Sequence, residues 1–226
     1  MLSGWTGFAL AWAAFLAAHV VPMLPPVRAR LVAALGRRGY FAAFGGLSVL
    51  LLWLLIRAAN AAPLVVLAPQ LPWQRWLVNL AMPPAILLAA YGVAMPNPFG
   101  LGRKGAGFDP ERPGILGVTR HPLMWALAIW AGAHLLANPD LAHAILFGAM
   151  LAYAARGIAR AEARARADGT LAALGARTGL WPLAALIAGR WHPRGRPSPR
   201  PFLWALLAWA AILALHPPVI GASPLP

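Results

Sequence analysis

The sequence predicts an all-α protein, a polytopic transmembrane helical bundle of about six spans in which residues 1–226 form one membrane domain. The chain is 61% hydrophobic with a mean hydropathy of +0.67, and only 11% of its residues are charged. A soluble domain is nearer a quarter charged. Several apolar runs approach the ~20 residues that cross a hydrocarbon layer about 30 Å thick. The lipid bilayer is therefore the first expected partner.

Six apolar segments are expected to span the membrane. They cover, in order, residues 5–24, 40–60, 73–95, 121–137, 141–158 and 202–216. The third contains Pro83 and Pro84, which remove amide donors inside a helix and are expected to kink it. The fourth and sixth are short for a span. Only "NPD" (residues 138–140) separates the fourth from the fifth, which predicts a tight turn in a helical hairpin.

A further segment, residues 170–190, is apolar but interrupted. It reads "TLAALGARTGLWPLAALIAGR", and Arg177, Gly179 and Pro182 break the run. These residues favour an interfacial or re-entrant helix over a seventh span. A seventh span would invert the orientation of everything that follows it.

The positions of the basic residues indicate the orientation. All of the 19 lysines and arginines except Arg57 and Arg75 lie in or beside the loops after the first, third and fifth segments. The positive-inside rule places these loops in the cytoplasm, so both termini are expected on the periplasmic side of a bacterial inner membrane. This topology explains the net charge of +14 without a nucleic-acid partner, which would require a soluble basic face.

Histidines in or beside the apolar segments are the candidate site residues, because ionisable groups inside spans are costly and usually functional. His19 lies five residues before the end of the first segment, and His121 starts the fourth. His134 follows thirteen residues later, about 20 Å along a helix. Depth in the membrane suggests two pairs, His19 with His121 on the cytoplasmic side and His134 with His143 on the outer side.

The fourth segment starts with Arg120, His121 and Pro122. Proline is favoured at the first helical position, and the unpaired amides there, together with Arg120, can hold a carboxylate or propionate. The alternative is that Arg120 and His121 only anchor the helix at headgroup level. His192 and His216, at or beyond span ends, are expected to bond backbone or water. The chain has no cysteine and no HExxH spacing, which excludes thiolate ligands and a zincin site.

Two stretches resemble the NnrU family of bacterial membrane proteins. They are "AAHVVPMLPPVRARLVAALGRRGYFAAFGGLSV" (residues 17–49) and "RHPLMWALAIWAGAHLLANPDLAHAILFG" (residues 120–148). The second is more specific, because it combines RHP, AHLLAN and the LFG of the next helix. The family is linked with nitrite and nitric oxide reduction in denitrifying bacteria, and it is similar to the plant carotenoid isomerase Z-ISO, which uses haem b.

This resemblance implies a haem b cofactor whose iron is ligated by some of His19, His121 and His134. Arg120 is expected to join these three in binding the cofactor. The implied partners are a nitrogen-oxide reductase or other redox components. The chain departs from the isomerase branch in one respect: no histidine lies between Ala144 and Arg160. The isomerase reaction is therefore not carried over.

The RHP motif is also similar to that of membrane methyltransferases of the isoprenylcysteine and phospholipid type, which use it to hold the carboxylate of S-adenosylmethionine. That resemblance implies a site at Arg120, His121, Arg160 and Glu162, although Ala163 stands where those enzymes have a second glutamate. A third alternative is a non-catalytic assembly factor for a reductase. The sequence leaves open which of the three applies, and so whether the chain is an enzyme.

Overall fold

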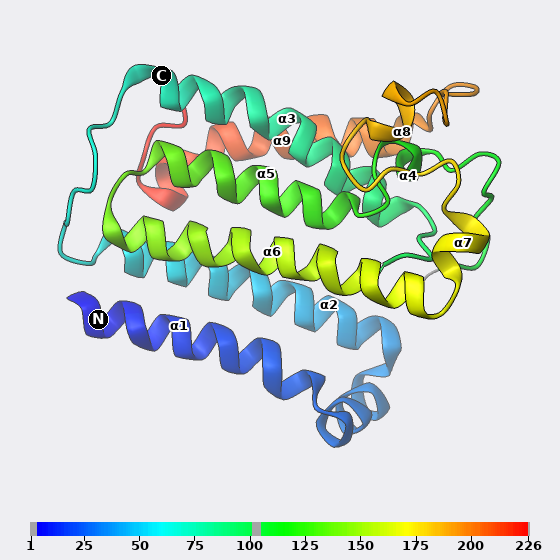
Figure 1. The fold of residues 1–226 in the computed structure, drawn as a ribbon. Coiled ribbons are helices and arrows are strands. Elements are labelled where there is room, and N and C mark those ends of the chain that lie inside the picture. Colours follow the sequence, from blue (N-terminus) through cyan, green and yellow to red (C-terminus); the bar gives the residue numbers. More distant parts are fainter. Residues whose placement is uncertain (1–3, 101–104, 226) are drawn as a thin grey trace. The chain divides into compact units, whose positions relative to one another are not determined.

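A computed structural model describes residues 4–100 and 105–225 (Figure 1). Apart from loops, this part of the chain is mainly helical, and an isolated antiparallel bridge pairs Val66 with Asp140. The predicted all-α class is confirmed. The helices are α1 (Gly4–Val20), the 3-10 helix η1 (Val21–Met23), α2 (Pro25–Asn60), α3 (Pro72–Ala94), α4 (Ile115–Val118), α5 (Pro122–Ala137), α6 (Leu141–Ala167), α7 (Thr170–Leu174), α8 (Ala184–Ile187) and α9 (Pro199–Ile220).

The chain divides into two compact units, which are described separately below. Unit 1 comprises Met1–Pro69 and Pro139–Leu146, and unit 2 comprises Gln70–Asn138 and Phe147–Pro226. Helix α6 therefore begins in unit 1 and continues in unit 2.

Five helical stretches among the described residues are long and apolar enough to cross a membrane: α1 with η1, α2, α3, α6 and α9. The sixth predicted segment is wrong in its length, because α9 has 22 residues and continues through two prolines. The fourth predicted segment is α5, which has 16 residues. At 1.5 Å per residue it extends about 24 Å, less than the hydrocarbon thickness. The six expected spans thus correspond to five long helices and the short helix α5. The chain is a membrane protein.

A glycine interrupts helix α2, whereas the kink predicted at Pro83 and Pro84 in α3 stays a prediction. Helix α3 runs through Pro83 and Pro84 without a break in its helical assignment. Helix α2 instead turns at Gly36, where φ is 67° and ψ is 164°. Glycine adopts positive φ without the steric cost that a Cβ adds. The turn separates a basic first part (residues 25–35) from a second part that contains the predicted span 40–60.

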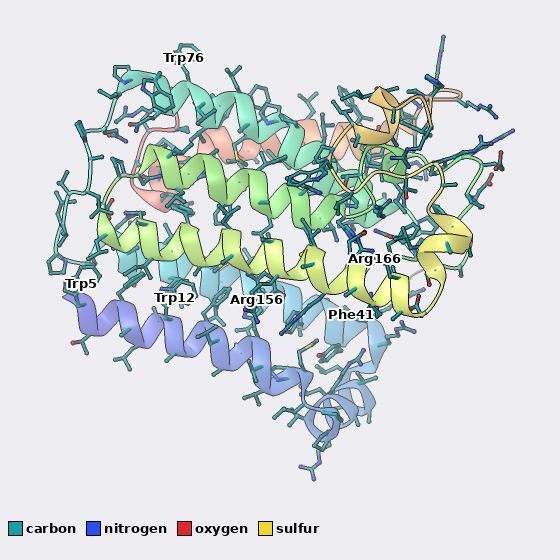
Figure 2. The ribbon with its side chains drawn as sticks, viewed as in Figure 1. Trp5, Trp12, Phe41, Trp76, Arg156 and Arg166 are labelled. Atoms are coloured by element: carbon teal, nitrogen blue, oxygen red, sulfur yellow. The ribbon has the colours of Figure 1, made fainter. Side chains whose placement is uncertain are left out.

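In unit 1, α1 and α2 lie side by side (Figure 1). The hydroxyl of Tyr40 donates to the carbonyl oxygen of Pro22 at 3.0 Å and joins α2 to the end of α1. Aromatic side chains recur every three or four residues on α1, which places them on one face. Each ring contacts the next at a centroid distance of 4.2–6.4 Å, in the order Trp5, Phe8, Trp12, Phe15 and His19. Figure 2 labels Trp5 and Trp12 on this helix.

In unit 2, α3 packs against α5 and α9, and α4 packs against α8. The buried face of α5 carries small residues, which lets neighbouring helices approach closely. These are Ala126, Ala131, Ala133 and Ala137. Residues 170–190 form the short helices α7 and α8 and no seventh span, and their position at the membrane interface stays a prediction.

Candidate functional site

A buried polar cluster lies in unit 2 at the start of α5. Arg120 Nε donates to Glu162 Oε1 at 2.6 Å, and His121 Nε2 lies 2.7 Å from the same oxygen. Arg120 is 9% exposed, and His121 and Glu162 are each 3% exposed. Charged side chains are almost never this buried unless they are paired. The cluster therefore joins α5 to a point about forty residues later on α6.

The second oxygen of Glu162 is also engaged. Arg120 Nη2 lies 3.4 Å from Oε2 and Arg166 Nη2 lies 3.3 Å from it. The Arg166 side chain is 61% exposed and lies near the end of α6 (Figure 2), so it covers the cluster from the solvent side. One carboxylate thus faces two guanidinium groups and an imidazole, and the cluster carries an excess of positive charge.

Local sequence explains why these side chains meet. His121 is the N-cap residue of α5 and Pro122 follows at its first helical position, so the chain enters the helix with the His121 side chain at the helix start. On α6, Glu162 lies between the buried small residues Ala161 and Ala165. Small side chains at these positions let the Glu162 carboxylate lie close to α5.

Thr178 completes the cluster. Arg120 Nη1 donates to Thr178 Oγ1 at 2.9 Å and to its carbonyl oxygen at 3.2 Å. The Thr178 hydroxyl in turn donates to the carbonyl oxygen of Gly175 at 2.9 Å. The guanidinium group of Arg120 therefore donates to both Glu162 and Thr178, and it ties three parts of unit 2 together.

The loop that contains Thr178 is bound along its length to the residues before and within α5. This pairing satisfies backbone groups that would otherwise be buried without partners. The hydrogen bonds run from Arg120 N to Gly179 O (2.9 Å), from Leu183 N to Val118 O (2.8 Å), from Thr119 Oγ1 to Leu180 O (3.0 Å) and from Trp125 Nε1 to Leu180 O (2.9 Å). The interrupted segment predicted at residues 170–190 therefore closes over the start of α5.

His19 and His134 lie in helices and outside this cluster. His19 Nδ1 donates to the carbonyl oxygen of Phe15 at 2.7 Å, and its ring stacks on Phe15 and meets the edge of Phe44. His134 Nδ1 donates to the carbonyl oxygen of Trp130 at 2.8 Å, and its ring contacts Trp130 and Phe147. Each imidazole is thus fixed by the carbonyl one turn earlier in its own helix.

His143 belongs to a second polar group, in unit 1. Its Nδ1 lies 2.7 Å from Asp140 Oδ2 and its Nε2 lies 3.0 Å from Asn60 Oδ1. Both predicted histidine pairs have one member in each unit, because His19 and His143 belong to unit 1 and His121 and His134 to unit 2. The two pairings stay predictions.

The described residues contain no group of three or more histidine, aspartate or glutamate side chains arranged to hold a metal ion. A haem does not require such a group, because its iron takes only one or two axial ligands from the protein. Single histidines with a suitably oriented ring nitrogen are therefore the relevant candidates for haem.

The comparison with protein families matches the family described as NnrU protein over residues 7–224. Neither the curated proteins nor the solved structures that were searched give a match. Since the matched region covers nearly the whole chain, the protein belongs to the NnrU family. The family predicted from the two sequence stretches is confirmed, and the similarity to the carotenoid isomerase stays a prediction.

Proposed function

We propose that this NnrU-family membrane protein binds haem b through an intramembrane histidine and acts in nitrogen-oxide or related redox metabolism. The orientation of His19 carries the proposal. Its Nδ1–H is held by the Phe15 carbonyl at 2.7 Å, so the neutral ring has its lone pair on Nε2. Histidines that ligate metals usually have the other ring nitrogen bound in this way, which fixes both the tautomer and the ring direction.

The surroundings of His19 fit a flat, largely apolar macrocycle. Phe15 and Phe44 flank the imidazole, and Trp12 lies two turns earlier on the same aromatic face of α1. Within the described residues, the buried Nε1 of Trp12 has no hydrogen-bond partner. A bound group with an acceptor oxygen, such as a propionate, would satisfy this donor once the side chains that cover it move aside. When bound, the haem would supply one-electron redox chemistry.

The other predicted ligands fit to different degrees. His134 is the second candidate, because its Nδ1 is tied to the Trp130 carbonyl as that of His19 is to Phe15. His121 and Arg120 fit less well, since Nε2 of the imidazole and the guanidinium already contact Glu162. Under this proposal Arg120 and His121 have a structural role and join helices. The partners are a reductase or other redox components. The protein lies in a bacterial inner membrane with both termini on the periplasmic side.

Absorption spectra of the detergent-purified protein, oxidised and reduced, test the proposal when haem is assayed against protein. We expect a b-type spectrum near one haem per chain that is lost in His19→Ala. His216→Ala is the matched control, because the half-buried His216 lies on α9 in unit 2 and is not one of the predicted haem ligands. His134→Ala shows whether a second axial ligand exists. Absence of haem after expression with haem supplied, or full haem content in both His19→Ala and His134→Ala, would contradict the proposal.

A second candidate function is favoured by the cluster itself. Arg120, His121 and Glu162, three of the four residues of the methyltransferase alternative, meet at one point, whereas Arg160 is exposed on α6. In this proposal the carboxylate of S-adenosylmethionine replaces Glu162 as the partner of Arg120. Calorimetric titration of the purified protein with S-adenosylmethionine tests it. Binding that is lost in Arg120→Gln and kept in Arg160→Gln would support this second function. Binding of neither haem nor S-adenosylmethionine would favour the assembly factor.

A further inference from the structure

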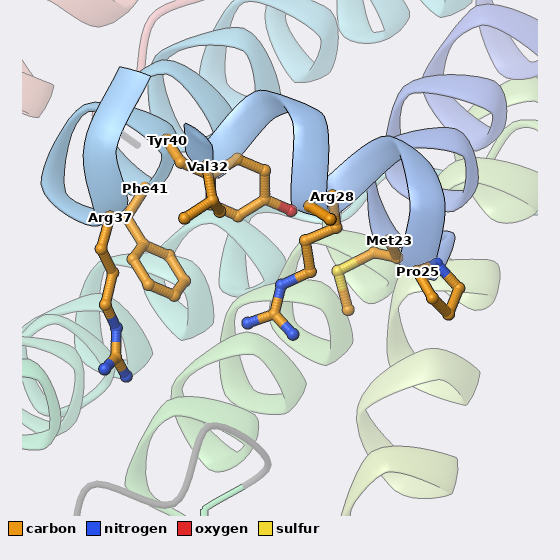
Figure 3. A pocket seen from close by; sticks show the side chains of 8 residues that line it. Met23, Pro25, Arg28, Val32, Arg37, Tyr40 and Phe41 are labelled. Atoms are coloured by element: carbon orange, nitrogen blue, oxygen red, sulfur yellow. The ribbon is translucent and has the colours of Figure 1, made fainter. Parts of the chain in front are cut away.

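An open cavity of about 560 Å³, most of whose lining side chains are exposed, lies in unit 1 beside the break in α2 (Figure 3). Its volume falls within the roughly 300–1,000 Å³ that is usual for small-molecule sites. Helix α2 changes direction at Gly36, and residues from both of its parts line one space. Figure 3 shows Arg28 from the first part and Arg37 from the start of the second extending in the same direction.

Neither Arg28 nor Arg37 is paired with a carboxylate among the residues that the structure describes. The sequence of unit 1 contains a single acidic residue, Asp140, and that side chain is bound to His143. The cavity therefore presents two guanidinium groups and lacks a counter-charge from its own unit.

Apart from the hydroxyl of Tyr40, which is bonded to Pro22, the rest of the lining is apolar. Met23, Val32 and Phe41 contribute a thioether, an aliphatic side chain and an aromatic ring. In Figure 3 the Phe41 ring lies beside Arg37, and Met23 lies beside Arg28. A ligand that fits this cavity has an anionic group for the arginines and an apolar portion for these walls.

We propose that this cavity binds an anionic phospholipid, with its phosphate between Arg28 and Arg37 and its glycerol and upper acyl chain along Met23, Val32 and Phe41. Guanidinium groups bind phosphate oxygens through paired hydrogen bonds. The cavity also lies where a span ends: α1 and η1 finish at Met23, and the apolar part of α2 starts after Gly36. Basic residues at that depth meet lipid phosphates. A free phosphate ion would gain nothing from the apolar walls.

Lipid binding to the full chain in detergent, followed by native mass spectrometry, tests the proposal. The probes are dioleoyl phosphatidylglycerol and, as the neutral lipid, dioleoyl phosphatidylcholine. We expect Arg28→Gln/Arg37→Gln to weaken phosphatidylglycerol binding about tenfold or more and to leave phosphatidylcholine unchanged. The matched control is Arg30→Gln/Arg38→Gln, which removes the same charge from exposed positions that do not line the cavity. An equal loss in both pairs would overturn the proposal.

Two further experiments distinguish a bound lipid from a free anion and from a general effect of charge. Val32→Phe keeps both arginines but puts a bulkier side chain on the wall along which the acyl chain is proposed to lie, so it is expected to reduce phosphatidylglycerol binding; unchanged binding would overturn the proposal. Inorganic phosphate at millimolar concentration is expected to leave the bound lipid in place, and displacement by phosphate would identify a free-anion site instead. Val32→Phe also serves if the arginine pair variant fails to fold.

Discussion

Glu162→Gln is expected to lower the free energy of unfolding by about 3–5 kcal/mol, the usual cost of removing one partner from a buried ion pair. The carboxylate accepts from Arg120 and His121, which are nearly inaccessible to solvent. A neutral amide leaves the Arg120 charge buried without its counter-charge. Thermal unfolding of the detergent-solubilised protein, followed by the fluorescence of its 11 tryptophans, measures the effect.

Arg166→Gln is the control for this prediction. Arg166 contacts the same carboxylate at 3.3 Å, but its side chain is 61% exposed, so we expect a change of at most about 1 kcal/mol. The double variant Arg120→Gln/Glu162→Gln should lose less stability than the sum of the two single variants, by about 1 kcal/mol or more, because each single substitution already removes the same ion pair. A Glu162→Gln variant as stable as Arg166→Gln would show that the pair does not hold α5 to α6.

The sequence was sufficient for the fold class and for most span positions, because apolar composition and segment length follow directly from the thickness of the bilayer. It did not indicate the turn within α2. Pro83 and Pro84 carry the stronger breaking signal, yet α3 continues through them, as membrane helices can when neighbouring groups satisfy the freed carbonyls. Gly36 carries a weaker signal, but the positive φ at that position is what turns α2.

The site was predicted only in part. The RHP motif at a helix start identified Arg120 and His121, and the methyltransferase resemblance identified Glu162 as a partner on α6. The same resemblance named Arg160, but this residue is exposed. The sequence alone does not show which side of α6 packs against other helices. Thr178 carried no signal, since a lone threonine in a loop has no periodicity. Depth along a span predicted the histidine pairs, but depth does not determine which helices are neighbours.

Gly117→Ala is expected to lower the free energy of unfolding by about 1–3 kcal/mol, the range for overpacking a filled site. A Cβ at Gly117 would fall inside the indole ring of Trp191. Neither partner can move easily. Gly117 N donates to Gly114 O at 3.0 Å in the buried helix α4, and Trp191 N donates to Ala185 O at 3.1 Å. The added methyl group must therefore displace backbone that is held by hydrogen bonds.

Gly132→Ala provides the matched comparison. Gly132 lies within α5, and nothing comes within 4 Å of a Cβ built there, so alanine is expected to be neutral or to stabilise the helix by up to about 1 kcal/mol. Thermal unfolding of both variants measures the difference. The clash also predicts that Gly117→Ala costs less in a Trp191→Ala background, because the indole ring is then absent. If Gly117→Ala is no less stable than Gly132→Ala, Trp191 does not pack on α4 as it does in this structure.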